Sequence, residues 1–179
     1  MVAHLDFADR LNRRAAELAA LFVTIQSMRM ACVPVLNPAL RVEVLGFEVM
    51  ARDEDEAAVG LGILITPWFM NLVRLPLLRV ADDSAVGHKQ THAVQGQSFE
   101  FIGAHEPAIG AFAACSLFSP MFEFGDQAAA RATALAVLEQ LRSAPQSAVA
   151  VPAATQSAEP PPARRAFLFG RSAASTAPR

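Results

Sequence analysis

The side chains in this sequence that are able to do chemistry are mainly its histidines and cysteines. They are His4, His88, His92 and His105, with Cys32 and Cys115. His88 and His92 are four residues apart, a spacing that would place two imidazoles on one face of a helix, as a metal site requires. The residues from Gly87 to His92 lack a helical pattern, and the carboxylate expected between two such ligands is absent. We interpret both histidines as solvated loop residues, with a metal site as the alternative.

Cys115 lies in or at the end of an apolar segment. A nucleophilic or ligating thiol needs a lowered pKa and a positioned base, and His105 is close enough in sequence to face Cys115 across a hairpin. A buried, unreactive thiol is the simpler interpretation, because free cysteine behaves as a small hydrophobe. Two cysteines give neither a disulfide framework nor zinc spacing. We predict no catalytic residue, no bound metal and no cofactor, since phosphate loops, nucleophile elbows and paired carboxylates are also missing.

The segment from Ile65 to Asn71 contains the only tryptophan. Pro67 fixes φ and removes a backbone donor, so regular structure must break there. Trp68, Phe69 and Met70 follow the break directly. Large apolar residues at a turn either plug the core or present a surface that another chain buries.

Charge and hydropathy exclude several classes of protein. With 15 basic and 17 acidic side chains the net charge is −2, which predicts no nucleic-acid partner. The acidic run Asp53, Glu54, Asp55 and Glu56 is typical of a solvated hairpin turn, and it lacks the spacing and glycine of a calcium loop. The segment 57–73 is uncharged, but its glycines, Pro67 and Asn71 favour a buried strand over a membrane-spanning helix. The N-terminal residues do not resemble a signal peptide, so we expect a cytoplasmic protein without stable membrane insertion.

Periodicity predicts helices at both ends of a strand-rich region. Apolar residues line one face of a helix from Asp6 to about Arg29, namely Phe7, Leu11, Ala15, Leu18, Phe22 and Ile25. A strand begins near Leu40 and changes phase beside Gly46, as a β-bulge would produce. Further strands are expected at 59–65, 91–94, 97–102 and 109–118, with 72–80 as an edge strand or extended connection because it contains Pro76. A second helix starts near Gly125 and ends before Pro145, with Ala128, Ala132, Leu135, Leu138 and Leu141 on one face.

This order of elements predicts an α+β fold with a mainly antiparallel sheet and a helix from each end packed on it. We expect a single domain over residues 1–143. Residues 144–163 are rich in Ala, Pro and Ser and are expected to form a flexible tether, because they cannot bury enough apolar area to offset their ordering entropy. A C-terminal segment, 164–179, follows.

Three segments together resemble the HybE family of nickel–iron hydrogenase assembly chaperones. They are Ile65-Thr66-Pro67-Trp68-Phe69-Met70-Asn71, Ala114-Cys115-Ser116-Leu117-Phe118-Ser119-Pro120 and Arg164-Arg165-Ala166-Phe167-Leu168-Phe169-Gly170-Arg171. Their order, their spacing and the chain length fit, and the resemblance covers residues from Phe7 to Arg171. It implies a non-enzymatic cytoplasmic chaperone that holds a hydrogenase small-subunit precursor until assembly is complete, with other maturation proteins as further partners.

The residue types suggest how such a client would be held. Trp68, Phe69 and Met70 would supply apolar contact, and the acidic run from Asp53 to Glu56 would face the arginines of a twin-arginine signal. Arg164, Arg165 and Phe167 resemble the same signal, although they lie at the wrong end of the chain to act as one. We therefore hypothesise that the tail mimics the client and occupies its groove when no client is present. The alternative is that these residues pin the C-terminus to the domain.

Two other functions remain open. One is a metallocentre-assembly protein that holds metal or a cluster through Cys115 and His105, or through His88 and His92. The other is a homo-oligomeric adaptor that buries its Trp68 patch against a second copy of itself.

Overall fold

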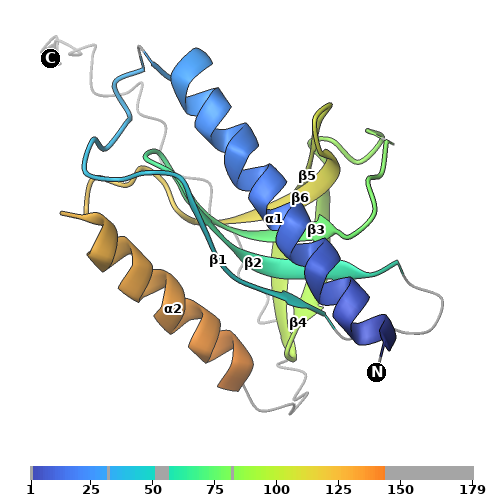
Figure 1. Ribbon diagram of the computed structural model, residues 1–179. Coiled ribbons are helices and arrows are strands. Elements are labelled where there is room, and N and C mark those ends of the chain that lie inside the picture. The colour runs from blue at the N-terminus through green and yellow to red at the C-terminus, as the bar shows by residue number, and fades with distance from the viewer. Residues whose placement is uncertain (1, 32, 51–56, 82, 144–179) are drawn as a thin grey trace, which may run out of the picture. The chain divides into compact units, whose positions relative to one another are not determined.

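A computed structural model describes residues 2–31, 33–50, 57–81 and 83–143 of this chain (Figure 1). Two helices enclose the strands in the sequence: α1 (Val2–Met28) comes first and α2 (Gln127–Ser143) last. The strands between them are β1 (Glu43–Val49), β2 (Val59–Ile65), β3 (Met70–Pro76), β4 (Lys89–Val94), β5 (Gln97–Glu106) and β6 (Gly110–Phe118). The predicted α+β fold, with an antiparallel sheet and one helix from each end, is confirmed.

The six strands form one sheet in the order β1-β2-β3-β6-β5-β4, and every neighbouring pair is antiparallel. The prediction of an edge strand near Pro76 is wrong, because β3 lies inside the sheet between β2 and β6. Pro76 is the last residue of β3 and pairs with Val59, the first residue of β2. A proline at the end of a strand does not interrupt the ladder of hydrogen bonds, so it is tolerated in an interior strand.

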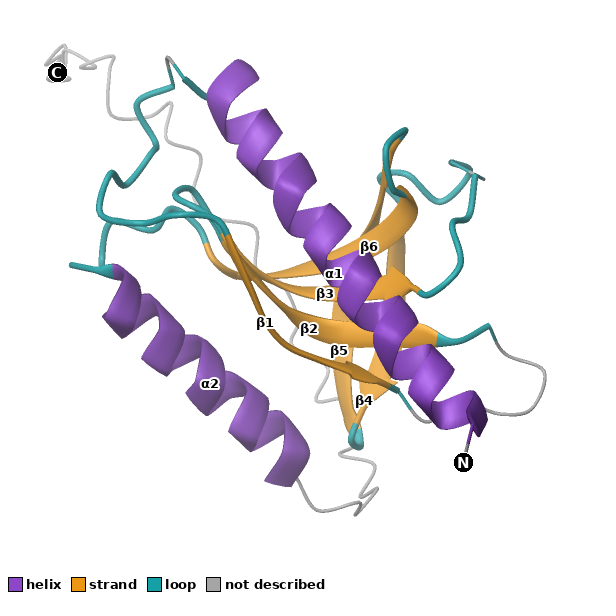
Figure 2. Cartoon of the chain, viewed as in Figure 1, coloured by secondary structure: helices purple, strands orange, loops and turns teal. Residues whose placement is uncertain are grey.

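Each face of the sheet packs on its own helix (Figure 2). The predicted apolar face of α1 is confirmed, since Leu11, Ala15, Leu18 and Phe22 are buried. Leu18 and Phe22 join a cluster with Leu64 and Val73 of the sheet. The other cluster joins α2 to the opposite side chains of the same strands, such as Ile63 and Leu72. Because both faces of β2 and β3 are covered, β2 has no polar side chain and β3 is apolar apart from Asn71 and Arg74.

The α2 face differs from the prediction in its first half. The buried residues are Gln127, Ala130, Ala134, Leu138 and Leu141. Ala128 and Ala132 are exposed, and Leu135 is 48% exposed. In an alanine-rich helix the faces differ little in hydrophobicity. The sequence therefore indicates that the segment is helical but not which face of the helix is buried.

The bulge predicted beside Gly46 is confirmed. The β1–β2 register shifts between Leu45 and Glu48, and Gly46 adopts a positive φ of 60°. A Cβ added to Gly46 would also lie 2.4 Å from Leu138 Cδ1 of α2. The backbone conformation therefore favours glycine here, and a larger residue would also displace the Leu138 side chain.

Arg14 is a buried charge that the helical pattern did not reveal. Its side chain is 4% exposed, and it donates from Nε to the carbonyl of Pro76 (3.1 Å) and from an Nη to the carbonyl of Ile109 (2.7 Å). It also forms an ion pair with Glu17 at 3.0 Å. These contacts join α1 to the end of β3 and to the turn before β6.

No helix in the described ranges is long and apolar enough to cross a membrane. The predicted tether and the C-terminal segment lie outside the described residues.

Replacing Arg14 by alanine is expected to lower the free energy of unfolding by about 3 kcal/mol, because two buried carbonyls lose a charged donor. Urea titration at pH 7 measures the loss.

Burial raises the pKa of the Glu17 carboxyl, but Arg14 and Arg79 outweigh this and hold that pKa below its ordinary value. The ion-pair contribution is therefore complete above the ordinary glutamate pKa and is lost as the pH falls through the lower folded value.

Arg13→Ala is the matched control, since Arg13 is exposed on the same helix and should change stability by less than about 0.5 kcal/mol. Equal losses in the two variants would contradict the structural role of Arg14.

Candidate functional site

The hairpin that joins β2 to β3 turns through Thr66, Pro67, Trp68 and Phe69. The buried Thr66 hydroxyl accepts hydrogen bonds from the backbone N–H of Phe69 (2.9 Å) and of Trp68 (3.3 Å). The Thr66 backbone N–H donates to the Phe69 carbonyl at 2.8 Å. These hydrogen bonds stabilise a turn in which Pro67 has no backbone N–H to donate. The turn therefore fixes the backbone of both aromatic residues.

The side chains of Trp68 and Phe69 are half-buried and pack on Phe22 of α1. The ring centroids of Phe69 and Phe22 are 5.6 Å apart in an edge-to-face arrangement, and those of Trp68 and Phe22 are 6.4 Å apart. Both aromatic residues thus belong partly to the core and partly to the surface, so each sequence interpretation holds for part of them. Met70 is fully buried in the cluster under α2. The predicted contact between Met70 and a partner would require the core to open, so Met70 does not belong to the exposed surface.

The segment 114–120 lies directly beside this hairpin. Met70 pairs with Phe118 and Asn71 with Ser116, across a register shift between β3 and β6. Beyond the strand, the Ser119 hydroxyl donates to the Trp68 carbonyl at 3.4 Å. Two segments that are separated by more than forty residues in the sequence therefore form one end of the sheet.

Asn37 connects three loops at that end. Its side-chain Nδ2 donates to the carbonyls of Met121 (2.9 Å) and Phe124 (2.7 Å), and its backbone N–H donates to the Pro67 carbonyl (2.8 Å). Its Oδ1 accepts from the Ala39 N–H at 3.0 Å. The residue is 7% exposed, so these bonds are largely shielded from water. Figure 2 shows the three loops together at one end of the sheet, beside the start of α2.

A third aromatic side chain is exposed at this end. Phe122 is 58% exposed, whereas the nearby Met121 and Phe124 are buried, with 0% and 6% of their surface exposed. The sequence analysis did not select Phe122. The available signal was the pair Phe122 and Phe124 on either side of Glu123, but the sequence does not say which of two such residues a turn will bury. We refer to Trp68, Phe69 and Phe122 as the sheet-end surface.

Several predicted contact residues lie outside the described part of the chain. They are the acidic run Asp53, Glu54, Asp55 and Glu56, and the tail residues Arg164, Arg165 and Phe167. The run falls between β1 and β2 in the sequence, and the tail follows α2. Their roles remain predictions.

Among the side chains that the structure describes, His88, His92, His105 and Cys115 are not brought together as a site. His105 pairs with Ala111 and Cys115 with Leu72. Cys115 is four residues farther along β6 than Ala111, roughly 13 Å at strand spacing, so the predicted facing of His105 and Cys115 is wrong. Burial raises the pKa of the Cys115 thiol, and the negative charge of Glu100 adds to this rise. His88 is exposed and His92 lies in β4 rather than on a helix. Among the described residues, no group of three metal-ligating side chains occurs.

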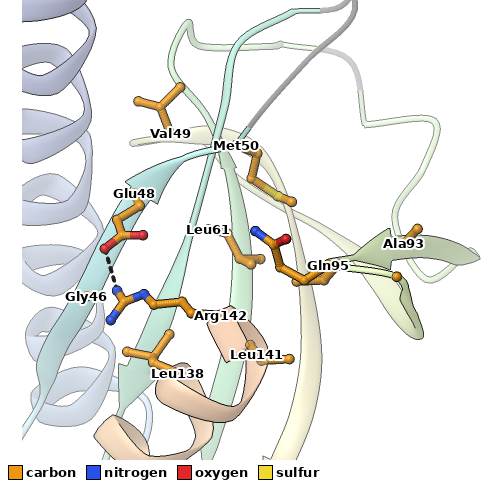
Figure 3. A pocket seen from close by; sticks show the side chains of 12 residues that line it. Gly46, Glu48, Val49, Met50, Leu61, Ala93, Gln95, Leu138, Leu141 and Arg142 are labelled. Carbon is orange, nitrogen blue, oxygen red and sulfur yellow. Dashed lines mark hydrogen bonds and ion pairs between the residues drawn. The ribbon is translucent and has the colours of Figure 1, made fainter. Parts of the chain in front are cut away.

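A hollow of about 320 Å³ opens between β1, the end of α2 and the β4–β5 turn (Figure 3). Its lining is largely apolar, with Val49, Met50, Leu61, Leu138 and Leu141 among the contributors. Glu48 and Arg142 also line it and form an ion pair with each other. Because these two charges compensate, the hollow favours an apolar side chain over a charged ligand.

The chain is similar to a known protein family and to several known proteins. The family model described as NiFe-hydrogenase assembly, chaperone, HybE matches residues 13–170. The chain is 47% identical over 164 residues to protein HoxT of Cupriavidus necator, which covers 88% of this chain and 89% of that protein. It is 39% identical over 153 residues to the hydrogenase expression/formation protein HupJ of Bradyrhizobium diazoefficiens, covering 86% and 85%. The solution structure of HybE from Escherichia coli superposes with a TM-score of 0.52 at 22% identity, covering 90% of this chain and 91% of that one, which supports the fold.

Cys115 is expected to react with iodoacetamide at pH 8 at least severalfold more slowly in the folded protein than in urea, because its raised pKa leaves less thiolate. Mass spectrometry of the peptide that contains Cys115 measures its rate separately from that of Cys32. The difference should narrow as the pH is raised, since more of the folded thiol ionises. Equal rates at pH 8 would contradict the shielded thiol and favour a redox or ligand-holding role.

Proposed function

Because the chain belongs to the HybE family of nickel–iron hydrogenase assembly chaperones, we propose that it binds a hydrogenase small-subunit precursor in the cytoplasm and holds it until assembly is complete. The name of the relative HupJ, a hydrogenase expression/formation protein, supports the hydrogenase setting. The observation that carries the proposal is the pairing of segments 65–71 and 114–120, which brings two of the three family-like segments together at one end of the sheet.

The geometry of the sheet-end surface suits reversible capture of an apolar segment. Trp68 and Phe69 are held by the Thr66 turn and by Phe22, so little side-chain freedom is lost when a client covers them. Rigid aromatic residues supply large contact areas at low entropic cost and often dominate binding energy. Both residues are half-buried, so a client would cover only the part of each ring that still faces solvent.

The client proposed here carries a twin-arginine signal, and its arginines need carboxylate partners. Asp53 to Glu56 remain the proposed partners for these cations. Charge reversal in this run is expected to weaken binding of a signal peptide, and the weakening should diminish at high salt.

The metallocentre-assembly alternative is less well supported. Its pairing of Cys115 with His105 conflicts with the strand register, and the raised thiol pKa disfavours a ligating thiolate. The homo-oligomeric adaptor is a separate possibility, which sedimentation over a range of concentrations distinguishes from a monomeric binder.

The test of the proposal is a calorimetric titration of the full chain with a twin-arginine signal peptide from a hydrogenase small subunit. We expect micromolar affinity, and a twin-lysine peptide should bind more weakly because it lacks bidentate hydrogen bonding. Trp68→Ala should weaken binding about tenfold, the size expected when a buried aromatic contact is lost.

Phe47→Ala serves as the matched control, since Phe47 is also a half-buried aromatic residue packed on the α1 side of the sheet. It should lower stability while leaving peptide affinity nearly unchanged. Equal weakening by both variants would remove Trp68 from the binding surface. If the wild-type chain binds the whole precursor but not the peptide, the folded subunit is the client; binding to neither would refute the proposal.

The tail provides a separate prediction. We propose that Arg164 to Leu168 compete with the client signal. The preceding 20 residues would span roughly 25 Å as a random chain and give a millimolar effective concentration. A chain that ends at Ala163 should therefore bind the signal peptide severalfold more tightly, and full-length Arg164→Ala/Arg165→Ala should do the same. Unchanged or weaker binding by both would contradict competition.

A further inference from the structure

The turn Met121–Phe124 holds Phe122 outward rather than leaving it free to collapse. The Phe124 N–H donates to the Met121 carbonyl at 3.2 Å, and both of these residues insert their side chains into the core. The rings of Phe124 and Phe118 meet edge-to-face at 5.2 Å. Asn37 binds the carbonyls at both ends of the same turn. With its two ends anchored, the turn exposes the residues between them, Phe122 and Glu123.

A single exposed apolar residue is ordinary on a protein surface, so Phe122 alone would carry little meaning. The position of Phe122 in the fold makes its exposure more informative. Asn37 joins the Phe122 turn to the Pro67 carbonyl, directly before Trp68, and Ser119 binds the Trp68 carbonyl from the other side. Phe122 therefore belongs to the same hydrogen-bonded loop assembly as the half-buried Trp68 and Phe69.

Two exposed carboxylates follow Phe122 in the sequence. Glu123 is exposed at the tip of the turn, and Asp126 is exposed at the start of α2, where its Oδ1 accepts from the Ala129 N–H at 2.8 Å. Glu43, Glu48 and Glu106 each form an ion pair with an arginine from another element. Within the described ranges, Glu123 has no such pair. An uncompensated carboxylate beside a rigid exposed aromatic residue matches a ligand that is both basic and apolar.

We propose that the Met121–Asp126 loop is part of the client-binding surface, and that its occupant is an extended client segment in which adjacent basic residues precede apolar ones. Glu123 binds the basic side chains, Phe122 covers the apolar residues, and the segment continues toward Trp68. This inference rests on the proposed function and locates acidic partners for the client among residues that the sequence analysis did not select.

The experiment compares four full-length variants in fluorescence-anisotropy titrations. Phe122→Ser and Glu123→Lys alter the proposed surface. Leu135→Ser and Glu139→Lys make the same chemical changes on the exposed side of α2, where Leu135 is 48% exposed. Three labelled peptides are used: the twin-arginine signal, the same peptide with both arginines replaced by glutamine, and a version with its apolar residues replaced by serine.

Phe122→Ser is expected to weaken binding of the twin-arginine peptide about tenfold, because a central aromatic contact is lost. Binding of the serine-substituted peptide should not change. Glu123→Lys should weaken the twin-arginine peptide by a similar factor, with little effect on the glutamine version, and the difference should shrink as salt is added. Both controls should stay within about twofold of wild type at every peptide, the range of an energetically neutral surface change.

The outcomes separate this inference from the proposed function. If Phe122→Ser and Glu123→Lys bind like wild type while Trp68→Ala is weakened, the loop is not part of the surface and the chaperone proposal stands. If Glu123→Lys weakens the glutamine peptide as strongly as the arginine peptide, the ion-pair role is overturned. If Phe122→Ser dissolves a concentration-dependent dimer and leaves peptide affinity unchanged, the occupant is a second copy of the chain. If wild type binds neither peptide nor precursor, the proposed function itself fails.

Discussion

The end of the sheet depends on one buried amide. Asn37 lies 84 residues before Met121 and 87 before Phe124, yet its side chain binds both of their carbonyls, while its backbone binds Pro67. Buried carbonyls without donors are costly, so these bonds fix the two aromatic turns relative to each other instead of adding a small local stability. This one residue holds the Trp68 turn and the Phe122 turn together at one end of the sheet.

The sheet itself is constrained by close helix packing on both faces. A Cβ at Gly60 would lie 2.2 Å from Leu11 Cδ1 of α1, and one at Gly46 would lie 2.4 Å from Leu138 Cδ1 of α2. At both positions a leucine side chain of a helix packs directly on the backbone of the sheet, so a Cβ there would force that leucine to shift. Arg14 extends the α1 contact to the opposite end of the sheet through Pro76 and Ile109.

The proposed client surface lies in loops at a strand end rather than in a deep cleft, which agrees with the way the helices cover the sheet. Both sheet faces are used for helix packing, so exposed aromatic area is concentrated in the connections between elements. Thr66 orders one connection and Asn37 orders the other two. Loops that are ordered by internal hydrogen bonds combine a rigid aromatic surface with access from solvent, which is what transient capture of an unfolded segment requires.

The sequence by itself determined the local features of this protein. The spacing of Leu11, Leu18 and Phe22, the apolar run of β2 and the phase change at Gly46 each depend on neighbouring residues, and all three were predicted correctly. Three short segments also identified the family. The sequence left open whether Met70 lies in the core, and it did not predict that Arg14 is buried, that β3 is interior, or that Phe122 rather than Phe124 faces solvent. Each of these was decided only by the tertiary structure, because burial and pairing depend on partners that lie far away along the chain.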